Sequence, residues 1–257
     1  MTSLAPFALD QPVQVIAHRG YSARAPENTI AALSLALDAG ASAVEFDLHT
    51  AGDGTPVLLH DGTLDRTTNG HGHVTDCDPD DLALLDAGSW FSPDFAGEPV
   101  PALTDALNAI EARVQTVFSE IKSVRRRRDI EAIVSVTRDA GLLERTVFIS
   151  MDWGLLDEVR RYESAALLGP IVEHAARIDS AFTRVSGDAR SLLDFDARIL
   201  LERPELARRA HEAGIPLAVW TVDDVAEAER LFGLGIRRIT TNQVGRLLAW
   251  AGTLPAS

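Results

Sequence analysis

Short apolar runs alternate with longer amphipathic segments along most of the chain. Eight of the apolar runs have the length of buried strands, at residues 13–18, 41–49, 114–122, 145–150, 165–172, 189–196, 215–222 and 236–241. Segments with apolar residues three or four positions apart predict helices at 28–40, 103–113, 127–141, 152–162, 202–214 and 223–235. Gly40, Gly141 and Gly214 mark the ends of three of these helices. Alternating strands and helices are typical of a parallel sheet covered by helices.

The number of strands predicts the fold class. Eight strands with interleaved helices in 257 residues predict an α/β protein with a (β/α)8 TIM barrel. A doubly wound open sheet is the alternative, but it needs fewer strands or a longer chain. The rhythm breaks at about 62–102, a stretch rich in Gly, Asp, Pro and Thr that is too long for an ordinary loop. We therefore expect a single domain over residues 1–257, with a small insertion at about 62–102 after the second strand region.

Composition and charge narrow the class of protein. Hydrophobic residues make up 46% of the chain, which is enough for a large core. The net charge of −14 argues against a nucleic-acid-binding protein, which needs a basic surface. Cys77 is the only cysteine, so no intramolecular disulfide is possible. The sequence shows neither a signal peptide nor an apolar run long enough to span a membrane, and we expect a cytoplasmic protein without stable membrane insertion.

Polar residues gather where the predicted strands end. The residues concerned are His18, Arg19, Glu45, Asp47, Glu120, Lys122 and Trp220. The C-terminal ends of the strands of a (β/α) barrel meet at one face, where catalytic residues lie. We therefore expect these side chains to share one site.

Three of these residues are acids with the spacing of a metal site. Glu45 and Asp47 lie two apart on one strand, so both point to the same face. Buried carboxylates that lie side by side repel each other, and burying them without a partner is costly. With Glu120 on the neighbouring strand they form an all-oxygen set that suits one divalent cation, Mg²⁺ or Ca²⁺, with Mn²⁺ a further candidate. A surface position or an arginine partner is the simpler explanation for any one acid, but the set of three favours a metal.

Two histidines and two cations complete the candidate site. His18 and His60 each end an apolar run, and imidazole serves as a general acid or base near neutral pH. Arg19 offers paired donors to a phosphate, and Lys122 adds a point charge. A metal site with these four residues indicates phosphoryl chemistry.

The motifs that carry these residues resemble those of the glycerophosphodiester phosphodiesterase family. They are IAHRGYSARAPENTIAAL, VEFDLHTAGDGTPVLLHDGTLDRTTNGHG, FSEIK and VWTVDD, and the resemblance runs from about Val15 to Thr241. It implies a (β/α) barrel and a small-molecule glycerophosphodiester substrate, hydrolysed to glycerol 3-phosphate and an alcohol. It also implies that Glu45, Asp47 and Glu120 hold the cation.

The resemblance further implies a mechanism. His18 and His60 are its acid–base pair, while Arg19 and Lys122 bind the phosphate and offset charge in the transition state. One histidine deprotonates the glycerol hydroxyl next to the phosphate, and that oxygen attacks phosphorus while the other histidine protonates the departing alcohol. Water then opens the cyclic phosphate. Which histidine acts first stays open, as does whether Trp220 lines the pocket for the substrate or belongs to the core.

Other residues of these motifs have two possible roles each. Glu27 and Asn28 either start the first helix or orient Arg19, and Asp61 either orients His60 or forms a turn. His49 lies in phase with the acid pair but is left outside the site.

Two further features have no fixed role. Asn242 stands where the family usually has aspartate, at a position outside the metal ligands. The run Arg125 to Arg128 is either a solvated loop or a means of steering an anionic substrate.

Two other functions stay open. One is a lysophospholipase D-like hydrolysis of lysophospholipids, for which Trp90, Phe91 and Phe95 in the insertion would line a groove for an acyl chain. The other is a non-catalytic phosphodiester-binding barrel, since a fold alone does not fix a function. The head group of the substrate and the oligomeric state cannot be inferred from the sequence.

Overall fold

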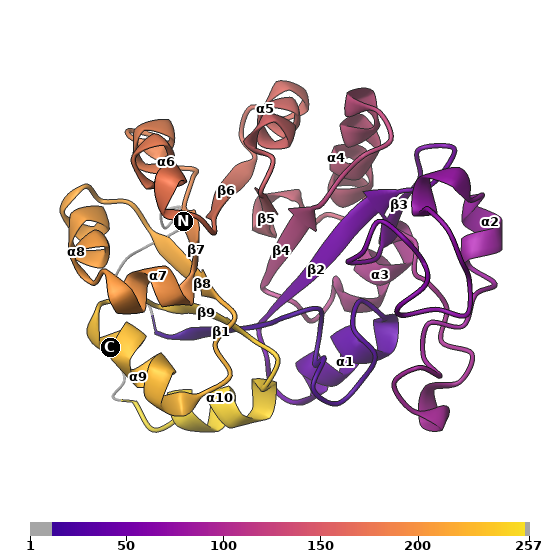
Figure 1. The fold of residues 1–257 in the computed structure, drawn as a ribbon, viewed down its shortest axis with the longest axis horizontal. Coiled ribbons are helices and arrows are strands. Elements are labelled where there is room, and N and C mark those ends of the chain that lie inside the picture. Colours follow the sequence, from indigo (N-terminus) through magenta and orange to yellow (C-terminus); the bar gives the residue numbers. More distant parts are fainter. Residues whose placement is uncertain (1–11, 255–257) are drawn as a thin grey trace.

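A computed structural model of the protein describes residues 12–254 and contains a closed barrel of parallel strands (Figure 1). The barrel strands are β1 (Gln14–Ala17), β2 (Ala43–Thr50), β4 (Thr116–Ile121), β5 (Thr146–Ser150), β6 (Leu167–Val172), β7 (Leu193–Asp196), β8 (Leu217–Trp220) and β9 (Arg238–Thr241). They pair in the order β2-β4-β5-β6-β7-β8-β9-β1, and a pairing of β1 with β2 closes the ring. The predicted TIM barrel is thus confirmed.

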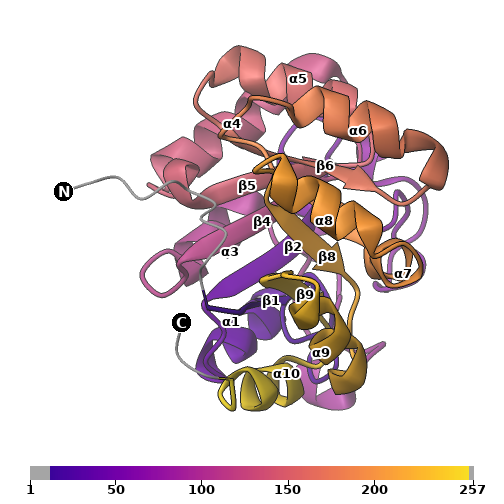
Figure 2. The ribbon, with the colours of Figure 1, turned by 90° about the vertical axis from the view of Figure 1, so that its left-hand side faces the viewer.

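Helices lie around the outside of the barrel in both ribbon views (Figures 1 and 2). They are α1 (Ile30–Asp38), α3 (Leu103–Ile110), α4 (Ile130–Asp139), α5 (Trp153–Tyr162), α6 (Ile178–Val185), α7 (Ala197–Glu202), α8 (Glu205–Glu212), α9 (Val225–Gly233) and α10 (Val244–Ala251). The sequence analysis predicts six of these and misses α6, α7 and α10. Over residues 12–254, no helix has the length and apolar character that crossing a membrane requires.

The burial of β2 explains how acids come to face the inside of the barrel. Every residue of this strand is buried, as is usual for a parallel strand covered on both faces. Val44, Phe46 and Leu48 belong to the cluster that packs against the outer helices, whereas Ala43 packs with the apolar residues of the barrel interior. Because side chains alternate along a strand, Glu45 and Asp47 point to the interior with Ala43.

Three helices end at the glycines that the sequence analysis predicts as helix ends. Gly40 follows α1 with φ +99°, a conformation that glycine adopts without steric cost. Its N–H donates to the carbonyl of Leu37, and the N–H of Ala41 donates to that of Ala36. The same pair of hydrogen bonds recurs after α4 and after α8.

The segment after β2 leaves the barrel wall. A short strand, β3 (Pro56–Leu58), runs antiparallel to the last residues of β2, with His49 opposite Val57. The chain then passes through α2 (Pro79–Leu82) at the right-hand edge of Figure 1 before it returns to the barrel at α3. This segment has a small core of its own, to which Leu64, Val74, Leu82 and Val100 belong.

Candidate functional site

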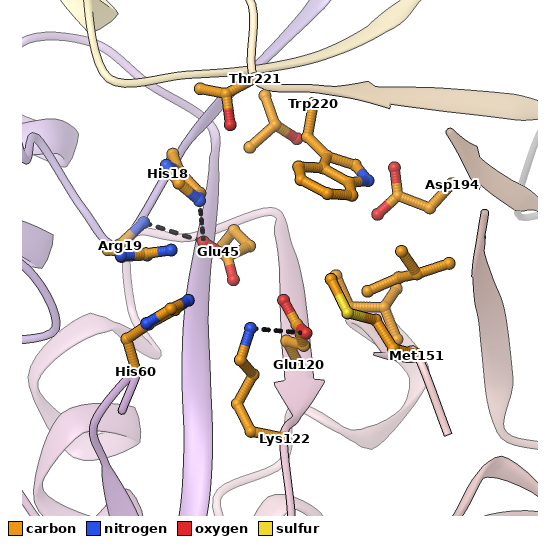
Figure 3. A pocket seen from close by; sticks show the side chains of 13 residues that line it. His18, Arg19, Glu45, His60, Glu120, Lys122, Met151, Asp194, Trp220 and Thr221 are labelled. Atoms are coloured by element: carbon orange, nitrogen blue, oxygen red, sulfur yellow. Dashed lines mark hydrogen bonds and ion pairs between the residues drawn. The ribbon is translucent and has the colours of Figure 1, made fainter. Parts of the chain in front are cut away.

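A pocket at the C-terminal ends of the barrel strands brings together most of the residues predicted for the site (Figure 3). Its lining includes His18, Arg19, Glu45, His60, Glu120, Lys122 and Trp220. Asp47, the eighth predicted residue, is fully buried and forms ion pairs with Arg19 and Lys122. The pocket has a volume of about 120 Å³, which limits it to a small ligand or to one arm of a larger one.

The three predicted metal ligands lie close together. Asp47 and Glu120 are neighbours in the register of β2 and β4, and one carboxylate oxygen from each of Glu45, Asp47 and Glu120 lies within 4.8 Å of the other two. Glu45 Oε1 and Asp47 Oδ1 are buried without a hydrogen-bond partner among the described residues. Asp47 Oδ1 still lies 3.5 Å from Lys122 Nζ, as an ion pair. Carboxylate oxygens are the ligands that a hard divalent cation prefers. The residues present therefore fit such an ion.

Repulsion between the three carboxylates changes the pKa values of these acids. Burial, together with Asp47 and Glu120, raises the pKa of Glu45 well above its ordinary value. Burial and the Asp47 carboxylate likewise raise the pKa of Glu120 from 4.5 to about 7. Burial alone would raise the pKa of Asp47 as well, but Arg19 and Lys122 outweigh it and hold that pKa low. Protons thus compete with a cation for Glu45 and Glu120.

The raised pKa of Glu120 predicts a pH-dependent gain in stability for Glu120→Gln. A carboxyl that titrates near 7 when folded and near 4.5 when unfolded stabilises the fold below pH 4.5 and loses that contribution as pH rises through 7. In EDTA, the variant should therefore gain about 2 to 3 kcal/mol over the wild type between pH 5 and pH 8. Urea unfolding at the two pH values measures the difference, and a gap that does not widen with pH contradicts the expectation.

Arg19 has an unusual backbone conformation that serves the acid cluster. Its φ is +55°, which is rare for a residue with a side chain and concentrates at functional sites. In this conformation the Arg19 N–H donates to Glu45 Oε2 at 2.9 Å, while Nε lies 3.0 Å from Asp47 Oδ2. The guanidinium also donates to Glu27 Oε1 at 2.8 Å.

Glu27 and Asn28 contact the site, which narrows the alternatives left open by the sequence. The helix cap of α1 is Thr29, whose side chain accepts from the N–H of Ala32. Asn28, at φ +58°, instead donates to Asp47 Oδ2 at 2.8 Å and accepts from the Asp47 N–H at 3.0 Å. Glu27 holds Arg19, so both residues position site groups, and the helix begins at its cap Thr29.

His18 is held in one orientation by Asn242. The distance from His18 Nδ1 to Asn242 Oδ1 is 2.7 Å, and the Asn242 amide donates to Asp223 Oδ2 at 2.8 Å. Because this second bond directs the amide oxygen toward His18, Nδ1 carries the proton and Nε2 is left with a lone pair. Nε2 lies 4.0 Å from Glu45 Oε2. Burial and the Arg19 charge lower the pKa of His18 to about 4, so the ring is neutral at pH 7.

His60 lies in a chain of charged residues that ends at Arg19. Its Nδ1 lies 2.6 Å from Asp61 Oδ1, and Arg66 bonds both Asp61 and Glu27. Glu27 in turn accepts from Arg19, so alternating charges connect His60 to Arg19. The hydrogen bond from Arg66 holds the pKa of Asp61 well below its usual range. Asp61 thus stays ionised and orients His60.

His49 holds the backbone of His60 in place. The residue is buried, and its Nδ1 lies 2.8 Å from Ser123 Oγ. Its Nε2 lies 3.0 Å from the carbonyl oxygen of His60. His49 therefore positions the backbone that carries His60 and does not line the pocket.

Loss of the Arg66 guanidinium should impair catalysis without impairing binding. Arg66→Met frees Asp61 and Glu27 from their shared partner, so His60 loses its orientation, and we expect kcat to fall about tenfold with KM changed less than twofold. Arg113→Met is the matched control, because Arg113 is equally exposed at 43% and pairs with Asp38 away from the site. Steady-state kinetics compare the two variants. Equal effects from both would show that the charge chain has no role.

Other sequence features lie outside the pocket. Arg125 donates to Asp53 O and pairs with Asp129, so it fastens the turn after β2, and Arg127 pairs with Asp152 and Glu158. None of Arg125 to Arg128 lines the pocket. Trp90, Phe91 and Phe95 stack edge to face in the segment after β3 and do not line it either.

Six lining residues were not predicted, and Asp194 is the one among them with an ionisable side chain. Asp194, on β7, is 2% exposed and faces the pocket from the side opposite His18 and His60 (Figure 3). Burial and the Glu120 charge raise the pKa of its carboxyl well above the ordinary value. The sequence signal was present, because an acid in the apolar run LLDF at a strand end follows the same rule that identified Glu45.

Comparisons with known proteins agree on one family. The model of the glycerophosphoryl diester phosphodiesterase family matches residues 18–246, which include every residue that lines the pocket. A glycerophosphodiester phosphodiesterase of Caldanaerobacter subterraneus subsp. tengcongensis is 34% identical over 91% of this chain and 96% of its own length. A probable glycerophosphodiester phosphodiesterase 1 of Mycobacterium tuberculosis is 31% identical over 92% of this chain and 91% of that protein.

Solved structures give the same result. A phosphodiesterase of Oleispira antarctica, in complex with the product sn-glycerol-3-phosphate, has a TM-score of 0.85 at 26% identity and covers 94% of this chain and 98% of its own. A glycerophosphodiester phosphodiesterase of Agrobacterium tumefaciens has a TM-score of 0.79 at 26% identity, covering 94% of this chain and 100% of its own.

Proposed function

Because the chain belongs to the glycerophosphoryl diester phosphodiesterase family, we propose that it hydrolyses glycerophosphodiesters to glycerol 3-phosphate and an alcohol, with His18 and His60 as the acid–base pair. The observation that carries this proposal is the position of the two histidines. They flank the acid cluster in one pocket, and each is oriented by a hydrogen bond to its Nδ1 (Figure 3). The Oleispira antarctica relative, which is bound to sn-glycerol-3-phosphate, supports the substrate class.

The hydrogen bonds of the two rings differ, and this supports an order of action. The Asn242 amide leaves His18 neutral with a free lone pair on Nε2, which suits a general base. The partner of the His60 ring is instead the Asp61 carboxylate, 2.6 Å from its Nδ1, and a negative charge in this place suits a general acid. We therefore propose that His18 acts first as the base and His60 as the acid.

The reaction then takes two steps that balance in protons. His18 Nε2 takes the proton of the glycerol hydroxyl next to the phosphate, the freed oxygen forms a bond to phosphorus, and the bond to the alcohol breaks as His60 gives it a proton. In the second step His60 takes a proton from water, whose oxygen attacks the cyclic phosphate. His18 returns its proton to the glycerol oxygen as that ring opens.

Cationic residues lower the charge on the phosphate. The Arg19 and Lys122 side chains line the pocket and offer donors to phosphate oxygens. Burial lowers the pKa of Lys122, but Asp47 and Glu120 outweigh that effect and raise it, so the amine stays charged. Glu45, Asp47 and Glu120 would hold one divalent cation, which when bound supplies positive charge beside the phosphate and the attacking oxygen.

A single assay tests the proposed function. Purified protein with Mg²⁺, Mn²⁺ or Ca²⁺ is given glycerophosphocholine, glycerophosphoethanolamine and lysophosphatidylcholine, and the phosphate-containing products are measured. We expect glycerol phosphate from the first two substrates. A preference for lysophosphatidylcholine would support the lysophospholipase D-like alternative, and cleavage of none of the three with any cation would contradict the proposal.

A further inference from the structure

Two polar groups on one wall of the pocket have no partner in the protein. Asp194 is 2% exposed, yet its carboxylate forms neither a hydrogen bond nor an ion pair among residues 12–254. The indole N–H of Trp220 is also buried and also lacks an acceptor there. Both residues line the pocket, and the indole nitrogen points toward the Asp194 side of it (Figure 3).

Unpartnered groups of this kind are costly and point to a ligand. A buried carboxylate or indole N–H without a hydrogen bond destabilises a fold, and native proteins rarely keep one without a function. Ser119 Oγ, another buried unpartnered atom, belongs to a barrel strand but does not line the pocket. Asp194 and Trp220 differ from it because a bound molecule can reach them.

The chemistry of the pair selects one class of ligand group. Indole N–H only donates, and a carboxyl oxygen accepts, also in the protonated form that burial of Asp194 favours by raising its pKa. A hydroxyl does both, so it can accept from Trp220 and donate to Asp194 at the same time. A phosphate or ester oxygen only accepts, an ammonium only donates, and a quaternary ammonium does neither. An alcohol hydroxyl therefore matches the pair best.

The position of the pair indicates which part of the substrate carries that hydroxyl. Asp194 lies across the acid cluster from His60, on the same side as Met151 (Figure 3). Ile171 is its register partner on β6, and Ile149 and Ile171 also line the pocket. This wall is apolar and Asp194 is almost completely buried, so the arm of the substrate that lies here must be small. The glycerol unit is the small arm of every glycerophosphodiester, whereas the alcohol varies in size.

We propose that Asp194 and Trp220 form a subsite for the terminal hydroxyl of the glycerol unit, the one that neither carries the phosphate nor attacks it. This inference rests on the proposed function, and it makes Asp194 a specificity-determining residue. In a lysophospholipid that hydroxyl is esterified to a fatty acid, so it can no longer donate to Asp194, and the acyl chain meets the closed wall. The subsite thus selects free glycerophosphodiesters over lysophospholipids.

A binding experiment tests the subsite without requiring turnover. Calorimetry with Mg²⁺ present compares sn-glycerol 3-phosphate with the propane-1,2-diol phosphate of the same configuration, which lacks only the terminal hydroxyl. We expect the wild type to bind the glycerol compound about tenfold to a hundredfold more tightly. Asp194→Leu and Trp220→Phe should each reduce this ratio toward one, and Asp194→Asn, which keeps an acceptor oxygen, should restore part of it.

Controls separate a binding role from a structural one. Ile171→Val trims the same wall without removing a polar atom, so it should weaken both ligands alike. Asp194→Asn should also raise Tm, because it removes a buried carboxyl that has no partner, while it lowers affinity for the glycerol compound. A residue with a purely structural role would not show these opposite effects.

The outcomes distinguish this inference from the proposed function. Equal affinity of the wild type for both ligands, or no binding of either, overturns the subsite even if glycerophosphodiesters are cleaved. An intact ratio in Asp194→Leu also overturns it. If the ratio behaves as expected but the protein cleaves no glycerophosphodiester, the subsite stands and the proposed function fails.

Discussion

His18→Ala and His60→Ala are each expected to lower kcat on glycerophosphocholine by about a thousandfold, and the two variants should respond differently to the leaving group. General acid–base catalysis of this kind contributes on the order of 10²- to 10⁴-fold per group. A p-nitrophenyl ester of glycerol phosphate has a leaving group that departs without a proton. His60→Ala should therefore regain most of the first-step rate on this ester, whereas His18→Ala should not, because the attacking hydroxyl still needs a base.

The measurement is release of p-nitrophenol in a single turnover, which reports the first step alone. The cyclic phosphate should accumulate in His60→Ala, because that variant also lacks the base for the second step, and phosphorus NMR detects it. His71→Ala serves as a control, since the His71 side chain is 85% exposed and pairs with Asp65. Recovery by His18→Ala in place of His60→Ala would reverse the assigned roles, and recovery by neither would contradict the two-histidine mechanism.

Glu45→Gln is expected to affect activity and stability in opposite directions. The substitution removes one of the three acids that would hold the cation, and we expect kcat/KM to fall at least about a thousandfold, as a loss of several kcal/mol of charge stabilisation implies. EDTA should lower wild-type activity to a similar level. Without metal, however, the variant should melt at a higher temperature than the wild type, because it relieves the repulsion that raises the pKa of Glu45.

Thermal melting with EDTA or with Mg²⁺ checks this prediction. A cation at about a hundred times its Kd should stabilise the wild type by about 2.7 kcal/mol and leave Glu45→Gln nearly unchanged. Glu163→Gln is a suitable control, since Glu163 pairs with Arg138 on the outside of the barrel. A Glu45→Gln protein that retains activity, or that still gains stability from every cation tested, would show that these acids are not the metal site.

The sequence predicted the barrel, and it predicted that polar residues from several strands gather in one pocket, because both follow local rules. A strand with apolar residues on one face and acids on the other, as in VEFDL, fixes which side chains point into the barrel. A polar residue at the C-terminal end of any barrel strand then reaches the same pocket, however far apart the strands are in the chain. This rule brought together His18, Glu45 and Glu120 without any knowledge of contacts.

Contacts between distant loops could not be predicted in this way. Arg66 bonds Asp61 five positions before it and Glu27 39 positions before it, and nothing in the spacing of these residues reveals the pairing. The amide orientation of Asn242 depends on Asp223, which lies after a different strand.

The missed helices α6 and α10 carry the same signal as the predicted ones. α6 has the apolar spacing of a helix, with Ile178, Ala181, Phe182 and Val185 buried, and α10 likewise buries Val244, Leu247 and Trp250. Both helices are eight residues long, as are α3 and α8, which the spacing did predict. Their length therefore does not explain why they were missed.

The segment after β3 has two parts, of which one contacts the residues of the pocket and the other does not. His60, Asp61 and Arg66 form the contacts to the pocket, whereas residues 67–102 line no part of it and pack on a small core that they share with Val57, Leu59 and Leu64. For protein engineering this separates the residues that must be kept from those that can be exchanged. Exchange of residues 67–102 for the corresponding loop of a relative should preserve catalysis, provided that the new loop fills the shared core.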